Sequence, residues 1–452
     1  MPDETLEGAL TGFAVDFPLS EVPANTQTHV KRLLVDGVGC ALAGDLADET
    51  ASVVSAMGIL GEGTSSVIGR SDSLSSMGAT MLNAYLMTAM TVCDVYRPAH
   101  CHITPLVLPP ALMAAEKGRA TGAEFLEAIV IGMEVTVRIA LGLDYPAFRA
   151  KGWHSPGVVG PFGSAAAIGR LGGFDQTTMS NAFGLAATQS AGSYLSWGTP
   201  AVKFHQARGA ASGVLAAEMA RQGFPGGQSP LTAPDGGVFN THSDGGRPDL
   251  ALADLGSRWE LEQVAVRLWP GASPVQAMLT AIFDIMKFDS VDPASVSKVE
   301  IGISTEDFGT HGHFGPPAGT FEALLSYPYL FSAALHDRQI WFEQVERPRY
   351  TDPELLSFAS SRIVVVPVDD LPVNGCRLQV ELNDGRRIER RIESARGTPE
   401  NPADDDEIRA KFHRCADRRV GEDRATEILD KLMDIESCPD MAQLTSLLQV
   451  GT

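Results

Sequence analysis

The segment Asp94–Pro105 concentrates groups that can move protons. It holds an acid, a phenol, a guanidinium and two imidazoles, contributed by Asp94, Tyr96, Arg97, His100 and His102. General acid–base catalysis requires protonatable groups of this kind, held on a rigid frame. The flanking segments, Met81–Val92 and Leu106–Glu116, are apolar and helix-forming, so they would hold these groups at the mouth of a helical core. An ordinary polar loop between two helices is the alternative interpretation.

A second histidine lies in a glycine-rich segment, residues 151–163, with the sequence KGWHSPGVVGPFG. Its glycines permit a tight backbone before the helix expected to follow, and amides at a helix N-terminus favour anions. His154 could act as a base at that helix start, or it could simply bond a nearby carbonyl. The glycine spacing does not match a dinucleotide-binding fingerprint, and no strand precedes it.

A third segment, Gly198–Ala211, combines cations with a histidine. Lys203 is one of only eight lysines in the chain, and His205 and Arg208 follow it before another helix rich in small residues. Cations in this arrangement could bind a carboxylate. A solvated turn that carries basic residues is the alternative.

Metal binding is poorly supported by the sequence. The six cysteines are scattered without a CxxC motif, as expected for free thiols in a reducing compartment. Cys93, Cys101 and His102 lie close together, but no second Cys/His pair with zinc spacing follows. His311 and His313 stand in a Gly/Pro-rich stretch, where we expect a mobile loop at most at the edge of a cleft. We therefore expect no metal.

Composition narrows the class of partner. The chain of 452 residues carries 56 acidic against 35 basic residues, a formal net charge of −21, which disfavours nucleic acids and anionic membranes. A small anionic substrate would need local cations to overcome this field. The start of the chain has no secretory pattern and no segment holds 18 uninterrupted apolar residues, so we expect a cytoplasmic protein.

The elements that must position these groups are mainly helical. Residues 1–260 are patterned as helices, of which Ala123–Leu141 is the clearest, with Glu134 and Arg138 spaced for an i,i+4 pair. Val30–Gly44 is rich in small residues, which let helices approach closely. Other helices are expected at 77–92, 163–170, 179–190 and 210–221.

The pattern changes near residue 295. Ser297–Ile303 and Arg362–Val368 have strand character, and Arg377–Leu382 and Arg386–Ile392 flank an Asp-Gly turn typical of a hairpin. Helices return at 404–416, 421–433 and 441–448. We therefore predict a mainly α fold: a large helical domain built from both chain ends (1–267 and 396–452), carrying a smaller inserted α+β lid domain (268–395), with the site in the cleft between them.

Taken together, these segments resemble the MmgE/PrpD family, which includes 2-methylcitrate dehydratase, cis-aconitate decarboxylase and iminodisuccinate epimerase. The resemblance covers nearly the whole chain. It rests on five motifs in order, at residues 33–44, 94–116, 152–175, 203–226 and 393–416. It implies a homodimer with no required metal or organic cofactor, acting on small di- or tricarboxylates. The common step that it implies is removal of a proton next to a carboxylate.

Four residues match the family motifs one by one. Asp94 corresponds to an acid of the Asp-rich loop, His102 to the histidine of a His-Pro pair, and His154 to the histidine after Gly-Trp. His205 corresponds to the histidine of the Lys-x-x-His segment, and Arg208 lies just beyond it.

The chain also departs from the family pattern. Val92 and Val95 stand where further acids are usual, and Val202 occupies the lysine position, with Lys203 one residue later. Where a Lys-x-x-Pro-x-His-like segment is expected, the chain has Arg267 and Ala272. Arginine can replace the lysine's charge and bind a carboxylate in a bidentate manner, whereas alanine cannot transfer a proton.

The resulting hypothesis is a cofactor-independent lyase, a dehydratase or decarboxylase, that abstracts a proton next to a carboxylate. An epimerase working through the same enolate is the second hypothesis, and a non-catalytic carboxylate-binding protein is the third. The expected catalytic residues are His102, His154, Asp94 and Tyr96. The expected substrate-binding residues are Lys203, His205, Arg208, Arg267 and His100.

Overall fold

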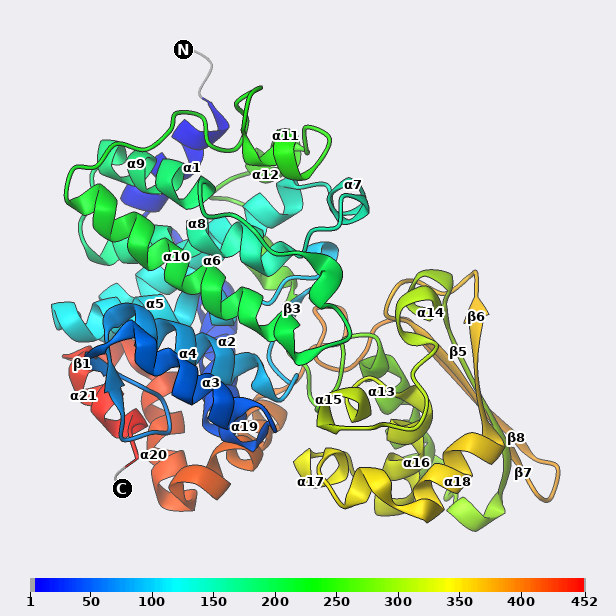
Figure 1. Cartoon of the computed structure of the whole chain (residues 1–452). Helices are drawn as coiled ribbons and strands as arrows, with labels where there is room; N and C mark the ends of the chain where they lie inside the picture. The colour runs from blue at the N-terminus through cyan, green and yellow to red at the C-terminus, as the bar shows by residue number, and fades with distance from the viewer. Residues whose placement is uncertain (1–4, 451–452) are drawn as a thin grey trace.

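The computed structural model describes residues 5–450 and divides into two lobes joined along one side (Figure 1). The larger lobe is helical and contains both the first part of the chain and its return after the smaller lobe. The smaller lobe carries a four-stranded sheet covered by helices. The mainly α fold with a smaller sheet-containing part is therefore confirmed.

The helical lobe is built around long, closely packed helices. Its helices are α1 (Leu6–Asp16), α2 (Ala24–Ala43), α3 (Thr50–Met57), α4 (Ser76–Ala89), α5 (Thr104–Gly118), α6 (Gly122–Gly142), α7 (Tyr145–Ala150), α8 (Ser155–Leu171), α9 (Gln176–Ala187), α10 (Phe204–Arg221), α11 (Val238–His242) and α12 (Pro248–Leu252). Two short antiparallel pairs accompany them: β1 (Glu62–Ser66) with β2 (Ser73–Leu74), and β3 (Val95–Tyr96) with β4 (Val264–Ala265).

The smaller lobe, here called the lid (residues 275–392), follows the expected strand pattern closely. Its elements are α13 (Val275–Phe288), β5 (Val296–Ser304), α14 (Thr305–His311), α15 (Thr320–Ala323), α16 (Tyr327–Asp337), α17 (Phe342–Val345), α18 (Pro353–Arg362), β6 (Ile363–Val368), β7 (Cys376–Leu382) and β8 (Arg387–Ile392). The strand order is β6-β5-β7-β8, parallel between β5 and β6 and antiparallel elsewhere. The hairpin around Asp384-Gly385 is confirmed.

Glycine lets the central helices of the large lobe pack backbone to backbone. A Cβ on Gly163 of α8 would lie 1.7 Å from Thr136 Oγ1 of α6, and one on Gly213 of α10 would lie 2.3 Å from Ser164 Cβ. Gly157 and Gly160 lie inside α8, which begins at Ser155, so the expected tight backbone before the helix is wrong. The helix starts earlier because Pro156 suits its first turn. Gly160 instead allows close contact with α5 and α10, and Gly157 allows close approach of the segment that follows α9.

The chain returns to the helical lobe through α19 (Asp405–Val420), α20 (Glu422–Met433) and α21 (Met441–Leu448). Asp404 and Glu407 form a capping box that fixes the start of α19. Along α2, glycine allows close approach, since a Cβ on Gly39 would lie 3.1 Å from the Phe412 ring of α19. The two ends of the chain therefore share one core.

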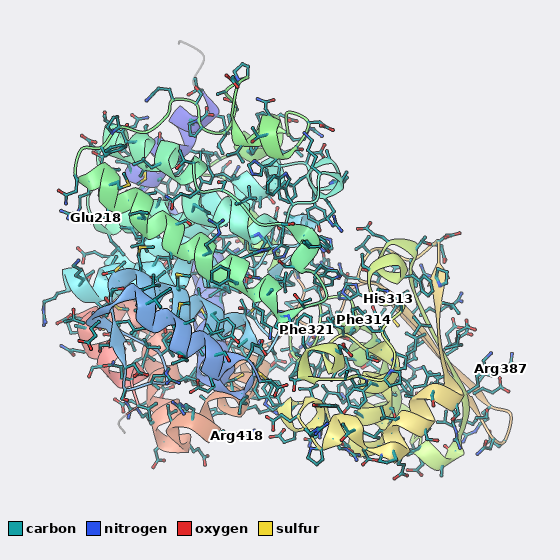
Figure 2. All side chains as sticks on the ribbon, in the orientation of Figure 1. Glu218, His313, Phe314, Phe321, Arg387 and Arg418 are labelled. Atoms are coloured by element: carbon teal, nitrogen blue, oxygen red, sulfur yellow. The ribbon has the colours of Figure 1, made fainter. Side chains whose placement is uncertain are left out.

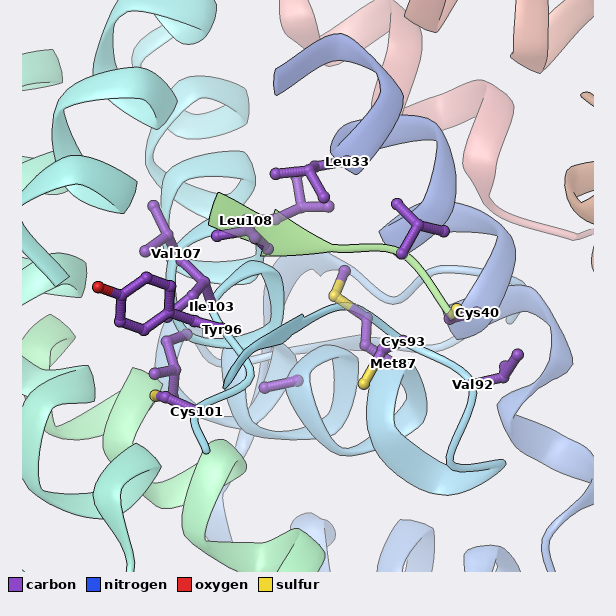
Figure 3. Close-up of a cluster of buried hydrophobic side chains, with 14 of the residues drawn as sticks. Leu33, Cys40, Met87, Val92, Cys93, Tyr96, Cys101, Ile103, Val107 and Leu108 are labelled. Atoms are coloured by element: carbon purple, nitrogen blue, oxygen red, sulfur yellow. The ribbon is translucent and has the colours of Figure 1, made fainter. Parts of the chain in front are cut away.

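A buried ion pair joins α2, near the start of the chain, to α19, near its end. The same pair contacts the loop that follows α4. Lys411 of α19 donates to the carboxylate of Asp36 on α2 and, at 2.7 Å, to the carbonyl of Val92. Both side chains are almost fully buried. Figure 3 shows part of the apolar core in this lobe, in which Val92 and Cys93 stand near Cys40 of α2.

We expect Lys411→Met to destabilise the protein by ~3–5 kcal/mol, because it leaves the Asp36 carboxylate buried without a partner. The double variant Asp36→Leu/Lys411→Met should recover most of that loss, since neither charge remains. Guanidinium-induced unfolding followed by circular dichroism measures both. Equal destabilisation of the single and double variants would contradict the interpretation.

Candidate active site

A cavity of about 300 Å³ lies between the two lobes. The helical lobe contributes residues from the loop after α4, from α7, from the start of α8 and from the segment between α9 and α10. The lid contributes residues between Glu306 and Leu325. The cleft between the lobes, expected from the sequence, is therefore present, and it brings together motifs that are far apart in the chain.

His102 lines this cavity with an uncharged imidazole ring. Its Nδ1 lies 2.6 Å from the carbonyl oxygen of Asp94. A carbonyl can only accept a hydrogen bond, so Nδ1 carries the proton and Nε2 is left with the lone pair. Desolvation, with a further contribution from the positive charge of Arg267, lowers the pKa of His102 to about 3. At neutral pH the His102 ring is therefore uncharged, with the lone pair of Nε2 free.

Asp94 and Tyr96 support this loop from behind the cavity. The Asp94 carboxylate accepts from the backbone N–H groups of Ile103 (2.7 Å) and Thr104 (3.2 Å), at the start of α5. Burial raises the pKa of Asp94 to about 6. Tyr96 is fully buried in β3, and its hydroxyl donates to Glu260 at 3.3 Å. Neither residue lines the cavity; Figure 3 shows Tyr96 beside Ile103 and Val107.

His154 and His205 form a hydrogen-bonded pair, with their Nδ1 atoms 2.9 Å apart. His154 lines the cavity, whereas His205 lies behind it, with its Nε2 3.4 Å from Ser196 Oγ. One ring of the pair must donate and the other accept, so a proton can be held on either side. Burial lowers the pKa of both, which keeps the pair neutral overall.

His100 also lines the cavity, in a left-handed backbone conformation with φ of 44°. Its ring stacks on Tyr145 at a centroid distance of 4.6 Å. Burial and then the charge of Arg149 lower its pKa to about 4. His100 is thus a neutral ring on the cavity wall.

Two of the three cations expected to bind substrate, Lys203 and Arg267, line the cavity but have different partners. Lys203 lines the cavity but pairs with Glu49 at 2.6 Å, which neutralises its charge. Arg267 lines the cavity and donates only to neutral groups: the Cys93 carbonyl (2.6 Å), the Gly271 carbonyl (3.0 Å) and the Cys93 thiol (3.3 Å). Among residues 5–450, no carboxylate lies within 4.0 Å of this guanidinium.

Arg208 lies on α10 outside the cavity lining. Its guanidinium donates to the carbonyls of Gln189 (2.8 Å), Gly157 (3.1 Å) and Ala191 (2.7 Å). It therefore ties the start of α8 to the segment that follows α9. The helix α10 begins at Phe204, earlier than expected, so His205 and Arg208 project from a helix and not from a turn.

Arg149 was missed in the sequence as a lining residue, and His311 was expected only in a mobile loop at the edge of a cleft. Arg149 at the end of α7 lies 3.2 Å above the centre of the Tyr194 ring. His311 ends α14 and is almost fully buried, so its expected place in a mobile loop is wrong. Ser304 caps α14 by accepting from the Asp307 N–H, and Ser304-x-x-Asp307 is the signal that could have indicated this helix.

The cavity also includes Ala272, at the position where the family pattern has a histidine. Its N–H donates to the Leu324 carbonyl of the lid at 3.0 Å. Phe321 and Leu325 of the lid line the cavity as well. In Figure 2, Phe321 lies between the two lobes. This side of the cavity is therefore apolar.

Metal-ligand geometry and membrane-spanning segments are not found in residues 5–450. No group of three or more His, Cys, Asp or Glu side chains in that range is arranged to hold a metal ion. Cys93 and His102 do lie close together, with sulfur and Nδ1 3.8 Å apart. No helix in the same range is long and apolar enough to cross a membrane.

We expect Arg208→Gln to lower the thermal midpoint by several degrees, because three backbone carbonyls lose their partner. The Michaelis constant for an accepted substrate should change by less than about threefold, since Arg208 lies outside the cavity. Differential scanning fluorimetry and steady-state kinetics check the two effects. A large rise in the Michaelis constant without loss of stability would instead assign Arg208 to substrate binding.

His311 should make the protein less stable in acid. Burial lowers its pKa to about 3 in the folded protein, against about 6.5 in an unfolded chain. The unfolded chain therefore binds more protons between these values, so stability falls as the pH drops from about 6.5 towards 3. The variant His311→Asn should lose less thermal stability than the parent between pH 7 and pH 4.5. Identical pH dependence in both proteins would contradict this.

Comparisons with known proteins agree with this architecture. The family model described as the MmgE/PrpD N-terminal domain matches residues 8–251, and that of the C-terminal domain matches residues 269–435. The chain is 25% identical to a cis-aconitate decarboxylase-like protein of Aspergillus oryzae, over 99% of this chain and 98% of the relative. It is 25% identical to a cis-aconitate decarboxylase of Aspergillus terreus, over 96% and 94%. It is 24% identical to the human cis-aconitate decarboxylase, over 82% and 79%. The two family models together span most of the chain, and the protein belongs to the MmgE/PrpD family.

Proposed function

We propose that this protein is a lyase that removes a proton from the carbon next to a carboxylate of a small di- or tricarboxylic acid. The observation that carries the proposal is the neutral His102 beside Arg267 in one cavity between the lobes, where no carboxylate of the described residues lies within 4.0 Å of the Arg267 guanidinium. A free base and an available cation are the two groups that this step requires. The names of the relatives support a decarboxylase among the lyases.

In the proposed reaction, the substrate carboxylate lies against the Arg267 guanidinium, which can donate two parallel hydrogen bonds once its present contacts rearrange. His102 Nε2 takes the adjacent C–H proton, and the electron pair moves into the carboxylate as an enediolate. The cation stabilises the negative charge that develops on the oxygens. His102 then becomes an imidazolium, which its Nδ1–H bond to the Asp94 carbonyl holds in place.

The next step distinguishes the members of this reaction class. In a dehydration, the electron pair expels hydroxide from the neighbouring carbon, and a proton from an acid makes it water. In a decarboxylation of an unsaturated substrate, the proton taken by the base returns to another carbon of the conjugated system; carbon dioxide then leaves, its bonding electron pair stays on carbon, and a second proton takes its place. The His102 imidazolium formed in the first step is the proposed proton donor, and the neutral His154–His205 pair, hydrogen-bonded through its Nδ1 atoms, is proposed to relay the proton. A homodimer, expected from the family resemblance, remains part of the proposal.

An epimerase is the second candidate, and His311 is the observation that favours it. The lid places this neutral imidazole in the same cavity as His102, which comes from the other lobe. Two bases from different walls suit return of the proton to the opposite face of an enolate. Deuterium incorporated at a stereocentre in deuterated water, without loss of water or carbon dioxide, would identify this reaction.

We expect His102→Gln to reduce proton exchange at the carbon next to a carboxylate by at least about 10²-fold, the usual contribution of a general base. Small di- and tricarboxylates are incubated in deuterated water and followed by proton nuclear magnetic resonance. Thermal-shift titration of the same variant checks that it still binds. The control His413→Gln changes a histidine on the surface of α19, paired with Asp417, and should retain full exchange.

Full exchange in His102→Gln would overturn the assignment of the base. If no di- or tricarboxylate stabilises the parent protein and none exchanges, the chain is a non-catalytic family member instead.

A further inference from the structure

The cavity is lined by the aromatic rings of Tyr194 and Trp197 from the helical lobe and of Phe321 from the lid. The Tyr194 and Trp197 rings are 5.8 Å apart, and Trp197 meets His311 of the lid edge-on at 5.1 Å. Phe321 of the lid lines the cavity and lies 5.2 Å from Lys203 Nζ. We call Tyr194, Trp197 and Phe321 the aromatic wall. Such a wall binds hydrocarbon by burying it from water.

The charges that line the cavity suffice for two carboxylates at most. Arg267 and Arg149 are its cations without a carboxylate partner among residues 5–450, because Lys203 is paired with Glu49. Glu306 and Asp307 bring negative charge from the lid. The Asp307 carboxylate accepts from Ser304 Oγ and from the Asn374 N–H, both at 2.7 Å, so it is held as an acceptor.

A third substrate carboxylate would therefore meet no cation of its own. Its remaining contacts would be neutral polar groups such as Ser273 and Gln206, the aromatic wall or the acids of the lid. Ala272 adds a methyl group where the family pattern has an imidazole, which removes a further donor. Burial of an unpaired carboxylate against apolar side chains is strongly unfavourable, and a like charge adds repulsion.

We propose that the substrate has no more than two carboxylates and carries an apolar arm that lies against the aromatic wall, and that tricarboxylates are rejected. This proposal rests on the proposed function, because it concerns the substrate of the same site. Arg267 and Arg149 bind the two carboxylates, the aromatic wall binds the arm, and Glu306 disfavours a third negative charge.

Three saturated acids that differ at one position test the proposal: succinate, 2-isobutylsuccinate and tricarballylate. The last two are nearly equal in size, since an isobutyl group replaces a carboxymethyl group. Isothermal titration calorimetry should give a Kd for 2-isobutylsuccinate that is lower than the Kd for succinate by about tenfold or more. About tenfold is the smallest gain expected when an apolar group enters a pocket that matches it. Tricarballylate should bind no more tightly than succinate.

Two pairs of variants assign the effect to the named residues. Phe321→Ala should abolish most of the advantage of 2-isobutylsuccinate over succinate, whereas Phe288→Ala, at an exposed phenylalanine elsewhere on the lid, should preserve it. Glu306→Gln should tighten binding of tricarballylate by about threefold or more and leave 2-isobutylsuccinate unchanged. Glu354→Gln, at an exposed lid carboxylate outside the cavity, should change neither.

The proposal is overturned if tricarballylate binds more tightly than 2-isobutylsuccinate, if all three acids bind alike, or if none binds. Proton exchange in deuterated water, measured on the same samples, separates this result from the proposed function. If the three acids bind with the expected order of affinities but none exchanges a proton, the lyase proposal is wrong and the proposed substrate specificity stands. Exchange on all three acids at equal rates and affinities defeats the specificity alone.

Discussion

The buried pair of Asp36 and Lys411 is the constraint on which the geometry of the site depends. It joins α2 to α19, and through the Val92 carbonyl it also fixes the loop that follows α4. The residues that follow Val92 in this loop are each held by a further hydrogen bond. Arg267 holds the Cys93 carbonyl, Asp94 caps the start of α5, and the Asp94 carbonyl orients His102. His102 is therefore positioned mainly by backbone carbonyls.

Burial also decides which groups are charged in the site. Several histidines contribute to the cavity, and desolvation keeps the pKa of His100 at about 4 and that of His102 at about 3. The nearby Cys93 thiol is neutral as well, because burial raises its pKa to about 12. The positive charge in the cavity thus comes from arginines, which remain protonated at any physiological pH. A chain with a net charge of −21 can in this way offer a local site for an anion.

Much of the fold could be predicted from local patterns, since the elements concerned are strongly periodic. The amphipathic segment around Glu134 and Arg138 forms α6, and the Asp-Gly hairpin forms β7 and β8. Boundaries were less predictable where glycine and proline occur inside a helix, as in α8. These residues usually interrupt helices, but here the contact between α8 and its neighbours requires them.

The site was predictable only in part, because partners distant in sequence decide what each side chain does. His102, His154 and Arg267 line the cavity, as their motifs suggested. Tyr96 lies in a strand whose pairing with β4 turns its ring into the core, and no local pattern shows this. The pairing of Lys203 with Glu49 is equally invisible in the sequence, as the two residues are far apart.

The hydrogen bond between Lys411 and the Val92 carbonyl also has a consequence for the order in which the protein is made and folds. A ribosome makes the loop around Asp94 and His102 long before it makes α19, and the whole lid is synthesised in between. Until residue 411 has emerged, Asp36 lacks its partner and the wall of the cavity lacks its support. A nascent chain can therefore form helices early but cannot complete the site, so activity should appear only after the last helices dock. A shortened product that ends before α19 would contain every histidine of the cavity and still be inactive.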